Sequence, residues 1–289
     1  MNYSNLEKYL GRTKKTVDTA LMKYLSGNGA YSGMIYKVLR YATFPGGKRI
    51  RPVLAIAAAE MCGSAYQKVL PTACAMELIH NYSLIHDDLP AMDNDDYRRG
   101  KLTVHKKYGE CMAILAGDAL LTKSFELIAE NAGIKGIKPI DVVNVIKLIA
   151  EYSGINGMVG GQVLDTIGMK GCNLADINIK EFVKEVHLKK TAALITASVV
   201  AGAVLSGVDG DKLNRIRKYG ENTGLAFQIV DDVFDNDINR LTYPGIYGIE
   251  KSKSMAGDLI KEAKQNISVF GKKAETLNQL ADYIIYRKS

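Results

Sequence analysis

The stretch L-I-H-D-D-L-P-A-M-D-N-D-D-Y-R-R-G, residues 84–100, decides how this chain is interpreted. It places five aspartates within residues 87–96 and then two arginines. The preceding residues 71–86 carry few charges and are predicted to form a buried helix, so the acids lie at its C-terminal end. The negative end of a helix dipole disfavours carboxylates, and neighbouring carboxylates raise one another's pKa. Magnesium relieves both effects, because it takes carboxylate oxygens and leaves positions for water and phosphate oxygens.

A second aspartate cluster lies far downstream, in F-Q-I-V-D-D-V-F-D, residues 227–235. Asp231 and Asp235 are four residues apart on a helical pattern, so they share one face. A single Asp-Asp pair is typical of an acidic surface loop, but two such clusters at the ends of apolar helices favour a metal site. We expect the two helix ends to face each other across a cavity and to hold metal ions and a diphosphate.

These motifs resemble those of the trans-type polyprenyl diphosphate synthases, and in particular the bacterial farnesyl diphosphate synthases. The resemblance rests on D-D-x-x-x-x-D at 87–93 with Arg98-Arg99, and on D-D-x-x-D at 231–235 preceded by Phe227-Gln228. It extends from Gly46 to residues 282–285. It implies an all-α, single-domain helical bundle of the isoprenoid synthase type around a central cavity, spanning residues 1–289. It also implies a cytoplasmic, Mg²⁺-dependent homodimer that joins isopentenyl diphosphate to dimethylallyl or geranyl diphosphate and yields farnesyl diphosphate.

The resemblance assigns site residues position by position. Metal ions are expected at the first and last aspartates of each motif, Asp87, Asp93, Asp231 and Asp235. Isopentenyl diphosphate is expected at Gly47, Lys48, Arg51, His80 and Arg99. The allylic diphosphate is expected at Arg98 and Lys190, and the catalytic groups around the allylic cation are Lys190, Thr191 and Gln228.

The residues themselves support part of this assignment. In F-P-G-G-K-R-I-R-P, residues 44–52, the proline and the glycines break the chain before a helix. Lys48 and Arg51 are three apart and are expected on one face of its first turn, where free N–H groups favour anions. An ordinary basic helix start is the alternative. A lone histidine such as His80 is commonly a core residue, and only the resemblance makes it a ligand.

Tyr82 and Ser83 are expected to control product length. Tyr82 lies five residues before Asp87, about 7.5 Å along the helix axis at ~1.5 Å per residue. If Asp87 holds the diphosphate, the hydrocarbon tail points back along this helix and meets the tyrosine ring. In farnesyl-type enzymes an aromatic residue at the matching position limits products to fifteen carbons. A core tyrosine with a satisfied hydroxyl group is the alternative.

Composition sets wider limits. The chain has 289 residues, 47% hydrophobic residues and no linker rich in Pro, Gly or Ser, which favours one helical domain. A net charge of +7 suits an anionic partner, and scattered basic residues without Trp favour a phosphorylated small molecule over nucleic acid. The four cysteines show no C-x-x-C spacing and are expected to be reduced. No signal peptide is expected, and uncharged residues 191–208 are small enough to be a buried helix rather than a membrane span.

One segment departs from the family pattern. Relatives carry a long basic loop after the second motif, whereas residues 236–242 contain Arg240 as the only cation. A non-catalytic binding subunit therefore stays an alternative, as does a geranylgeranyl diphosphate synthase. A phosphohydrolase using His86 and Asp87 is disfavoured, because that chemistry needs a histidine well upstream and none precedes His80. The sequence leaves product length and allylic preference open.

Overall fold

The computed structural model describes residues 4–27, 33–169, 178–235 and 241–286. Apart from one two-stranded hairpin, the regular structure of this part of the chain is helical, which confirms the predicted all-α class. Contacts divide the chain into two compact units, residues 1–53 with 67–137 and residues 54–66 with 138–289. The single domain expected from the sequence stays a prediction.

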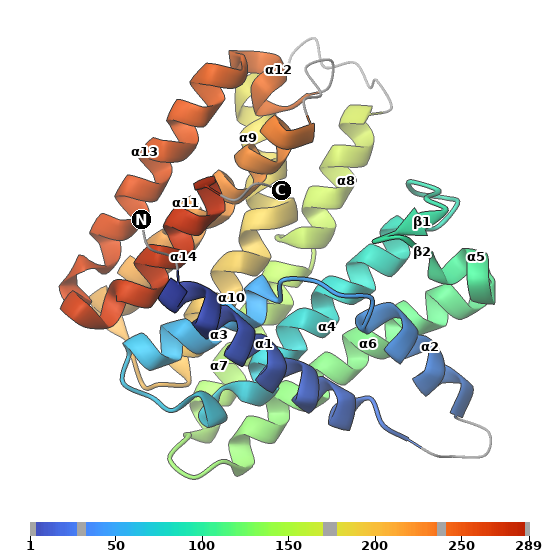
Figure 1. Ribbon diagram of the computed structural model, residues 1–289, viewed down its shortest axis with the longest axis horizontal. Helices are drawn as coiled ribbons and strands as arrows, with labels where there is room; N and C mark the ends of the chain where they lie inside the picture. The colour runs from blue at the N-terminus through green and yellow to red at the C-terminus, as the bar shows by residue number, and fades with distance from the viewer. Residues whose placement is uncertain (1–3, 28–32, 170–177, 236–240, 287–289) are drawn as a thin grey trace. The chain divides into compact units, whose positions relative to one another are not determined.

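The first unit contains the first aspartate motif. Its central pair is α4 (Leu70–Asp87) and α6 (Glu110–Glu130), which run side by side in Figure 1. Most of α4 is buried, as its low charge predicted. The other elements of this unit are α1 (Ser4–Tyr24), α2 (Gly33–Thr43), β1 (Tyr97–Arg98), β2 (Lys101–Leu102), α5 (Val104–Tyr108) and the short 3₁₀ helices η1 (Tyr66–Lys68) and η2 (Asn131–Gly133). Helix α3 (Ile50–Met61) begins in this unit and ends in the second.

The second unit is built around α10 (Ala193–Val204), whose residues 193–203 are all buried. Helix α11 (Gly210–Asp235) packs against α10 and α13 (Ile249–Ile267). The remaining elements are α7 (Pro139–Ser153), α8 (Met158–Met169), α9 (Ile179–His187), the π-helix η3 (Leu188–Ala192), α12 (Tyr243–Tyr247), the 3₁₀ helix η4 (Ser268–Ala274) and α14 (Glu275–Tyr286). Within the described ranges, none of the helices is long and apolar enough to cross a membrane.

Local sequence explains the boundaries that matter for the site. Asn178 caps α9 by accepting hydrogen bonds from the N–H groups of Lys180 and Glu181. Small residues allow α10 to pack closely, since a Cβ on Gly202 would lie 2.2 Å from the carbonyl oxygen of Ala55. Most of the short segment after Asp235, residues 236–240, lies outside the described residues. Cys172 also lies outside them.

Candidate active site

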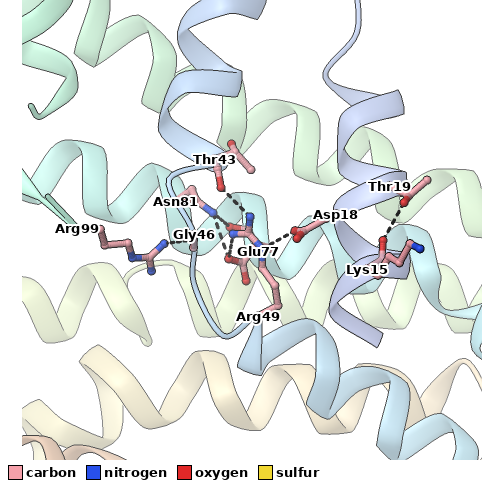
Figure 2. Close-up of polar contacts among 9 residues, drawn as sticks. All are labelled: Lys15, Asp18, Thr19, Thr43, Gly46, Arg49, Glu77, Asn81 and Arg99. Atoms are coloured by element: carbon pink, nitrogen blue, oxygen red, sulfur yellow. Dashed lines mark hydrogen bonds and ion pairs between the residues drawn. The ribbon is translucent and has the colours of Figure 1, made fainter. Parts of the chain in front are cut away.

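A buried arginine organises the loop before α3. The Arg49 guanidinium is 1% exposed and donates to Asp18 Oδ1 at 2.8 Å, to Glu77 Oε1 at 2.7 Å and to the Thr43 carbonyl oxygen at 2.8 Å (Figure 2). These three acceptors come from α1, α4 and the end of α2. Arg49 therefore anchors the loop internally, while its neighbour Lys48 is exposed.

The loop geometry corrects one detail of the sequence interpretation. Helix α3 begins at Ile50, and Arg49 has a left-handed φ of 52°. Lys48 therefore precedes the helix and does not share a helical face with Arg51. Residue type alone does not separate Arg49 from the two flanking cations, Lys48 and Arg51.

A tight hairpin brings Arg99 to the same loop. Strands β1 and β2 are antiparallel, and the two turn residues Arg99 and Gly100 have φ values of 51° and 75°, as type I′ turns require. Arg99 Nη1 donates to the Gly46 carbonyl oxygen at 2.5 Å, as Figure 2 shows. Gly47 has φ +126°, and a Cβ there would lie 2.8 Å from Arg99 Nη1. Only glycine accommodates both the backbone and this approach.

His80 lies in the same cationic environment. Burial, together with the Arg51 and Arg99 guanidinium groups, lowers the pKa of His80 well below its ordinary value of 6.5. The ring is therefore neutral at physiological pH. The burial part of this effect disfavours any charge, but the part due to the guanidinium groups reflects a positive potential, which favours a bound anion. The structure thus brings together Gly47, Arg51, His80 and Arg99 within one unit, around the loop that carries Lys48.

The first aspartate motif divides into members with different surroundings. Helix α4 ends at Asp87, and the loop turns back so that the Asp93 N–H donates to the Asp87 carbonyl oxygen at 2.9 Å. Asp88 is buried and accepts from Arg98 Nε at 2.7 Å. Arg98, expected to bind the allylic diphosphate, is thus an internal partner of Asp88 and also contacts Asp95.

Tyr82 and Ser83 lie on the last turns of α4. Tyr82 is 6% exposed, and its ring meets the His86 ring edge-to-face at 5.8 Å. Ser83 Oγ donates to the His80 carbonyl oxygen, within the helix. A Cβ on Gly117 of α6 would lie 2.0 Å from His86 Nε2, so this glycine makes room for the ring that contacts Tyr82.

In the second unit, the helix carrying Lys190 and Thr191 widens into the π-helix η3. Single-turn π segments are frequent at functional sites. Glycines on two neighbouring helices make room for η3. A Cβ on Gly161 would lie 2.2 Å from Lys190 N, and a Cβ on Gly224 would lie 2.5 Å from Ala192 Cα. Lys190 Nζ contacts Asp165 Oδ2 at 2.6 Å. Asp165 ends the G-G-Q-x-x-D run of residues 160–165, so this run supplies the partner of Lys190.

A chain of hydrogen bonds connects Thr191 to the second aspartate motif. Thr191 Oγ1 lies 2.6 Å from Gln228 Oε1, and Gln228 Nε2 lies 2.8 Å from Asp232 Oδ1. Asp232 Oδ2 lies 2.8 Å from His187 Nε2. Sequence reasoning missed His187, which lies three residues before Lys190 and one before η3.

Each motif offers a pair of aspartates as candidate magnesium ligands. Asp87 and Asp93 are joined by a backbone hydrogen bond, and Asp231 and Asp235 lie one turn apart on the last turns of α11. Among the described residues, no three His, Cys, Asp or Glu side chains form a group able to hold a metal ion. Because magnesium is commonly held by one or two carboxylates, with water and substrate phosphates completing its shell, these pairs fit the ion.

The chain is similar to known proteins over nearly its whole length. A family model described as polyprenyl synthetase matches residues 32–243. A dimethylallyltranstransferase of Fischerella ambigua is 43% identical, with 98% of this chain and 84% of that protein covered. A geranylgeranyl diphosphate synthase of Cyanophora paradoxa is also 43% identical, with 99% and 97% covered. The crystal structure of an FPP/GFPP synthase from Zymomonas mobilis matches with a TM-score of 0.91 and 35% identity, covering 97% of this chain and 99% of that one. These similarities confirm the expected all-helical isoprenoid synthase fold.

Proposed function

The chain belongs to the polyprenyl synthetase family as a trans-prenyltransferase that joins isopentenyl diphosphate to an allylic diphosphate, and we propose that farnesyl diphosphate is its main product. The observation that carries this proposal is the placement of Tyr82. Its ring is buried, lies five residues before Asp87 on α4 and is held against His86. A large fixed ring at that depth limits the length of a hydrocarbon tail that starts at Asp87.

Isopentenyl diphosphate is assigned to the cationic loop of the first unit. Arg51, Arg99 and the exposed Lys48 supply positive charge, and neutral His80 supplies a hydrogen-bonding ring. Guanidinium groups match phosphate geometry through paired N–H donors. Arg49 contributes by holding the loop, since its own donors are used on protein oxygens.

The allylic diphosphate is assigned to the aspartate motifs, to Arg98 and to Lys190. Asp87, Asp93, Asp231 and Asp235 would hold Mg²⁺, which when bound neutralises charge on the leaving diphosphate. Lys190 exchanges its contact with Asp165 for the diphosphate. The C–O bond breaks with its electron pair leaving on the diphosphate oxygen, and the isopentenyl double bond attacks the resulting allylic carbon. Loss of a proton to the released diphosphate forms the new double bond. Thr191 and Gln228 face this carbon as fixed dipoles.

Purified protein with Mg²⁺, isopentenyl diphosphate and labelled geranyl diphosphate tests the proposal through product chromatography. Wild-type protein is expected to stop at fifteen carbons. Tyr82→Ala removes the ring and is expected to shift the main product to twenty carbons or more, because the tail extends into the vacated volume. Tyr82→Phe keeps the ring and serves as the matched control, with an unchanged product. A twenty-carbon product from wild-type protein would refute the assignment of Tyr82.

Geranylgeranyl diphosphate is the second candidate product. Several relatives more than 40% identical are named geranylgeranyl diphosphate synthases, including those of Cyanophora paradoxa and Catharanthus roseus. The same chromatogram separates the two products. The homodimer implied by the resemblance is tested by light scattering on the purified protein, and a cytoplasmic location stays part of the proposal.

A further inference from the structure

The hydrogen-bond chain from His187 to Thr191 has a fixed direction. His187 Nδ1 lies 2.6 Å from the Val183 carbonyl oxygen. A carbonyl oxygen only accepts hydrogen bonds, so Nδ1 carries a proton. The 2.8 Å contact between His187 Nε2 and Asp232 Oδ2 also requires a proton between the two atoms. Whichever of the two atoms holds that proton, the other carboxylate oxygen, Oδ1, is left as an acceptor.

The acceptor at Asp232 Oδ1 then sets the orientation of the next two groups. Gln228 must present its NH₂ group to Asp232 and its carbonyl oxygen to Thr191. Facing a carbonyl oxygen at 2.6 Å, the Thr191 hydroxyl group must donate its only hydrogen there. The Thr191 oxygen can therefore offer only its lone pairs to any other neighbour.

Burial makes this orientation stable. The His187 and Asp232 side chains are 6% and 7% exposed, so water does not compete for their bond. The Tyr243 ring covers His187 edge-to-face at 5.3 Å. Thr191, at the far end, is only half-buried and lies in the π-helix η3. The His187 end of this hydrogen-bond chain is thus rigid and buried. Its accessible end is the Thr191 hydroxyl oxygen.

We propose that His187 and Asp232 are positioning residues that fix Thr191 as a hydrogen-bond acceptor, so that its oxygen lone pairs face the allylic cation and its hydroxyl hydrogen is withheld from the diphosphate. This inference rests on the proposed prenyl transfer. A threonine free to rotate would instead be able to donate to the diphosphate, a strong acceptor, and would then stabilise the ground state as much as the transition state. Interactions stronger in the transition state are the ones that raise kcat.

Two probes separate these roles by calorimetry in the presence of Mg²⁺. Geranyl thiolodiphosphate is an unreactive substrate analogue that reports on diphosphate binding. An allylic ammonium compound of the same chain length, added with inorganic diphosphate, reports on recognition of the cation. His187→Leu removes both ring nitrogens and with them the contacts to Val183 and Asp232. His187→Gln is the matched variant, because its side-chain NH₂ group can still donate to Asp232.

His187→Leu and Thr191→Val are each expected to weaken binding of the ammonium probe by about tenfold, the scale of one polar interaction. Both variants should bind the thiolodiphosphate as wild-type protein does, and His187→Gln and Thr191→Ser should retain most of the ammonium affinity. The double variant should bind the ammonium probe no more weakly than either single variant, because both substitutions break the same hydrogen-bond chain. In turnover the loss should fall on kcat, with the allylic KM unchanged.

Other outcomes overturn the inference. Equal weakening of both probes would mean that Thr191 serves the diphosphate or that His187 only supports the fold. Unchanged binding of both probes would mean that the hydrogen-bond chain has no part in recognising the cation. The Thr191 variants keep the test decisive if His187→Leu does not fold. Failure of wild-type protein to bind geranyl thiolodiphosphate would instead refute the proposed function.

Discussion

Replacing Arg49 by methionine is expected to destabilise the protein by about 3–5 kcal/mol, the range measured when one partner of a buried ion pair is removed. Glu77 is 3% exposed and lies 2.7 Å from Arg49, so the substitution leaves a buried carboxylate without its charge partner. It also removes the donors to Asp18 and to the Thr43 carbonyl oxygen. Methionine was chosen because it is long, unbranched and fills irregular space.

Two companion variants isolate the cause. Asp18 is 31% exposed, so Asp18→Asn should cost less than about 1 kcal/mol. Combining Arg49→Met with Glu77→Gln removes the uncompensated charge, and this double variant should regain about 1–3 kcal/mol relative to Arg49→Met. Urea unfolding measures all four proteins. A loss below about 1 kcal/mol in Arg49→Met, or no recovery in the double variant, would refute the buried-charge explanation.

The same set of variants reports on function. Because Arg49 anchors the loop carrying Lys48, its loss should raise the KM for isopentenyl diphosphate while leaving the KM for the allylic substrate unchanged. Arg49→Lys should not rescue this effect, since one ammonium group cannot serve three acceptors placed around a planar guanidinium. Equal changes in both KM values would indicate general loosening of the fold.

Two further predictions concern pH and backbone packing. Burial and the neighbouring guanidinium groups of Arg51 and Arg99 lower the pKa of His80, so below pH 6.5 the unfolded chain takes up a proton that the folded chain does not. The free energy of unfolding should therefore fall with decreasing pH by up to ~1.4 kcal/mol per pH unit, and His80→Gln should remove that part of the slope in urea titrations at pH 5–7. Gly161→Ala puts a methyl group against Lys190 N, so we expect a loss of about 1–3 kcal/mol in stability together with a fall in kcat. Gly257→Ala is the control and should be neutral or stabilising, because a Cβ there would meet no atom of the described residues within 4 Å apart from its chain neighbours and its own helix backbone.

Much of the fold followed from local signals in the sequence. The buried character of α4 and α10 followed from the lack of charges in their sequences. Close packing at Gly117 and Gly161 involves groups from distant positions, namely the His86 ring and the Lys190 backbone. A glycine within a helical pattern indicates close packing. It does not identify the group that approaches.

The site shows the same limit more sharply, because the sequence treats Lys48, Arg49 and Arg51 as one basic run. Arg49 differs from the other two, because its backbone is left-handed and its guanidinium group donates to three internal acceptors. Asp18 and Glu77, which determine this outcome, lie 31 and 28 residues away. Charge alone therefore cannot separate a cation that binds substrate from one that holds the loop.

The two Asp-Asp pairs follow one physical rule. Adjacent residues on an α-helix point about 100° apart, so only one member of each pair can face a ligand on a given side. Asp88 and Asp232 are the buried members, and each contacts a nitrogen of its own unit, on Arg98 and on His187. A buried carboxylate without such a partner would lose its charge or destabilise the helix. Each motif therefore combines a buried aspartate, which is bonded within its own unit to a residue 10 or 45 positions away, with a neighbouring aspartate, Asp87 or Asp231, that is only half-buried.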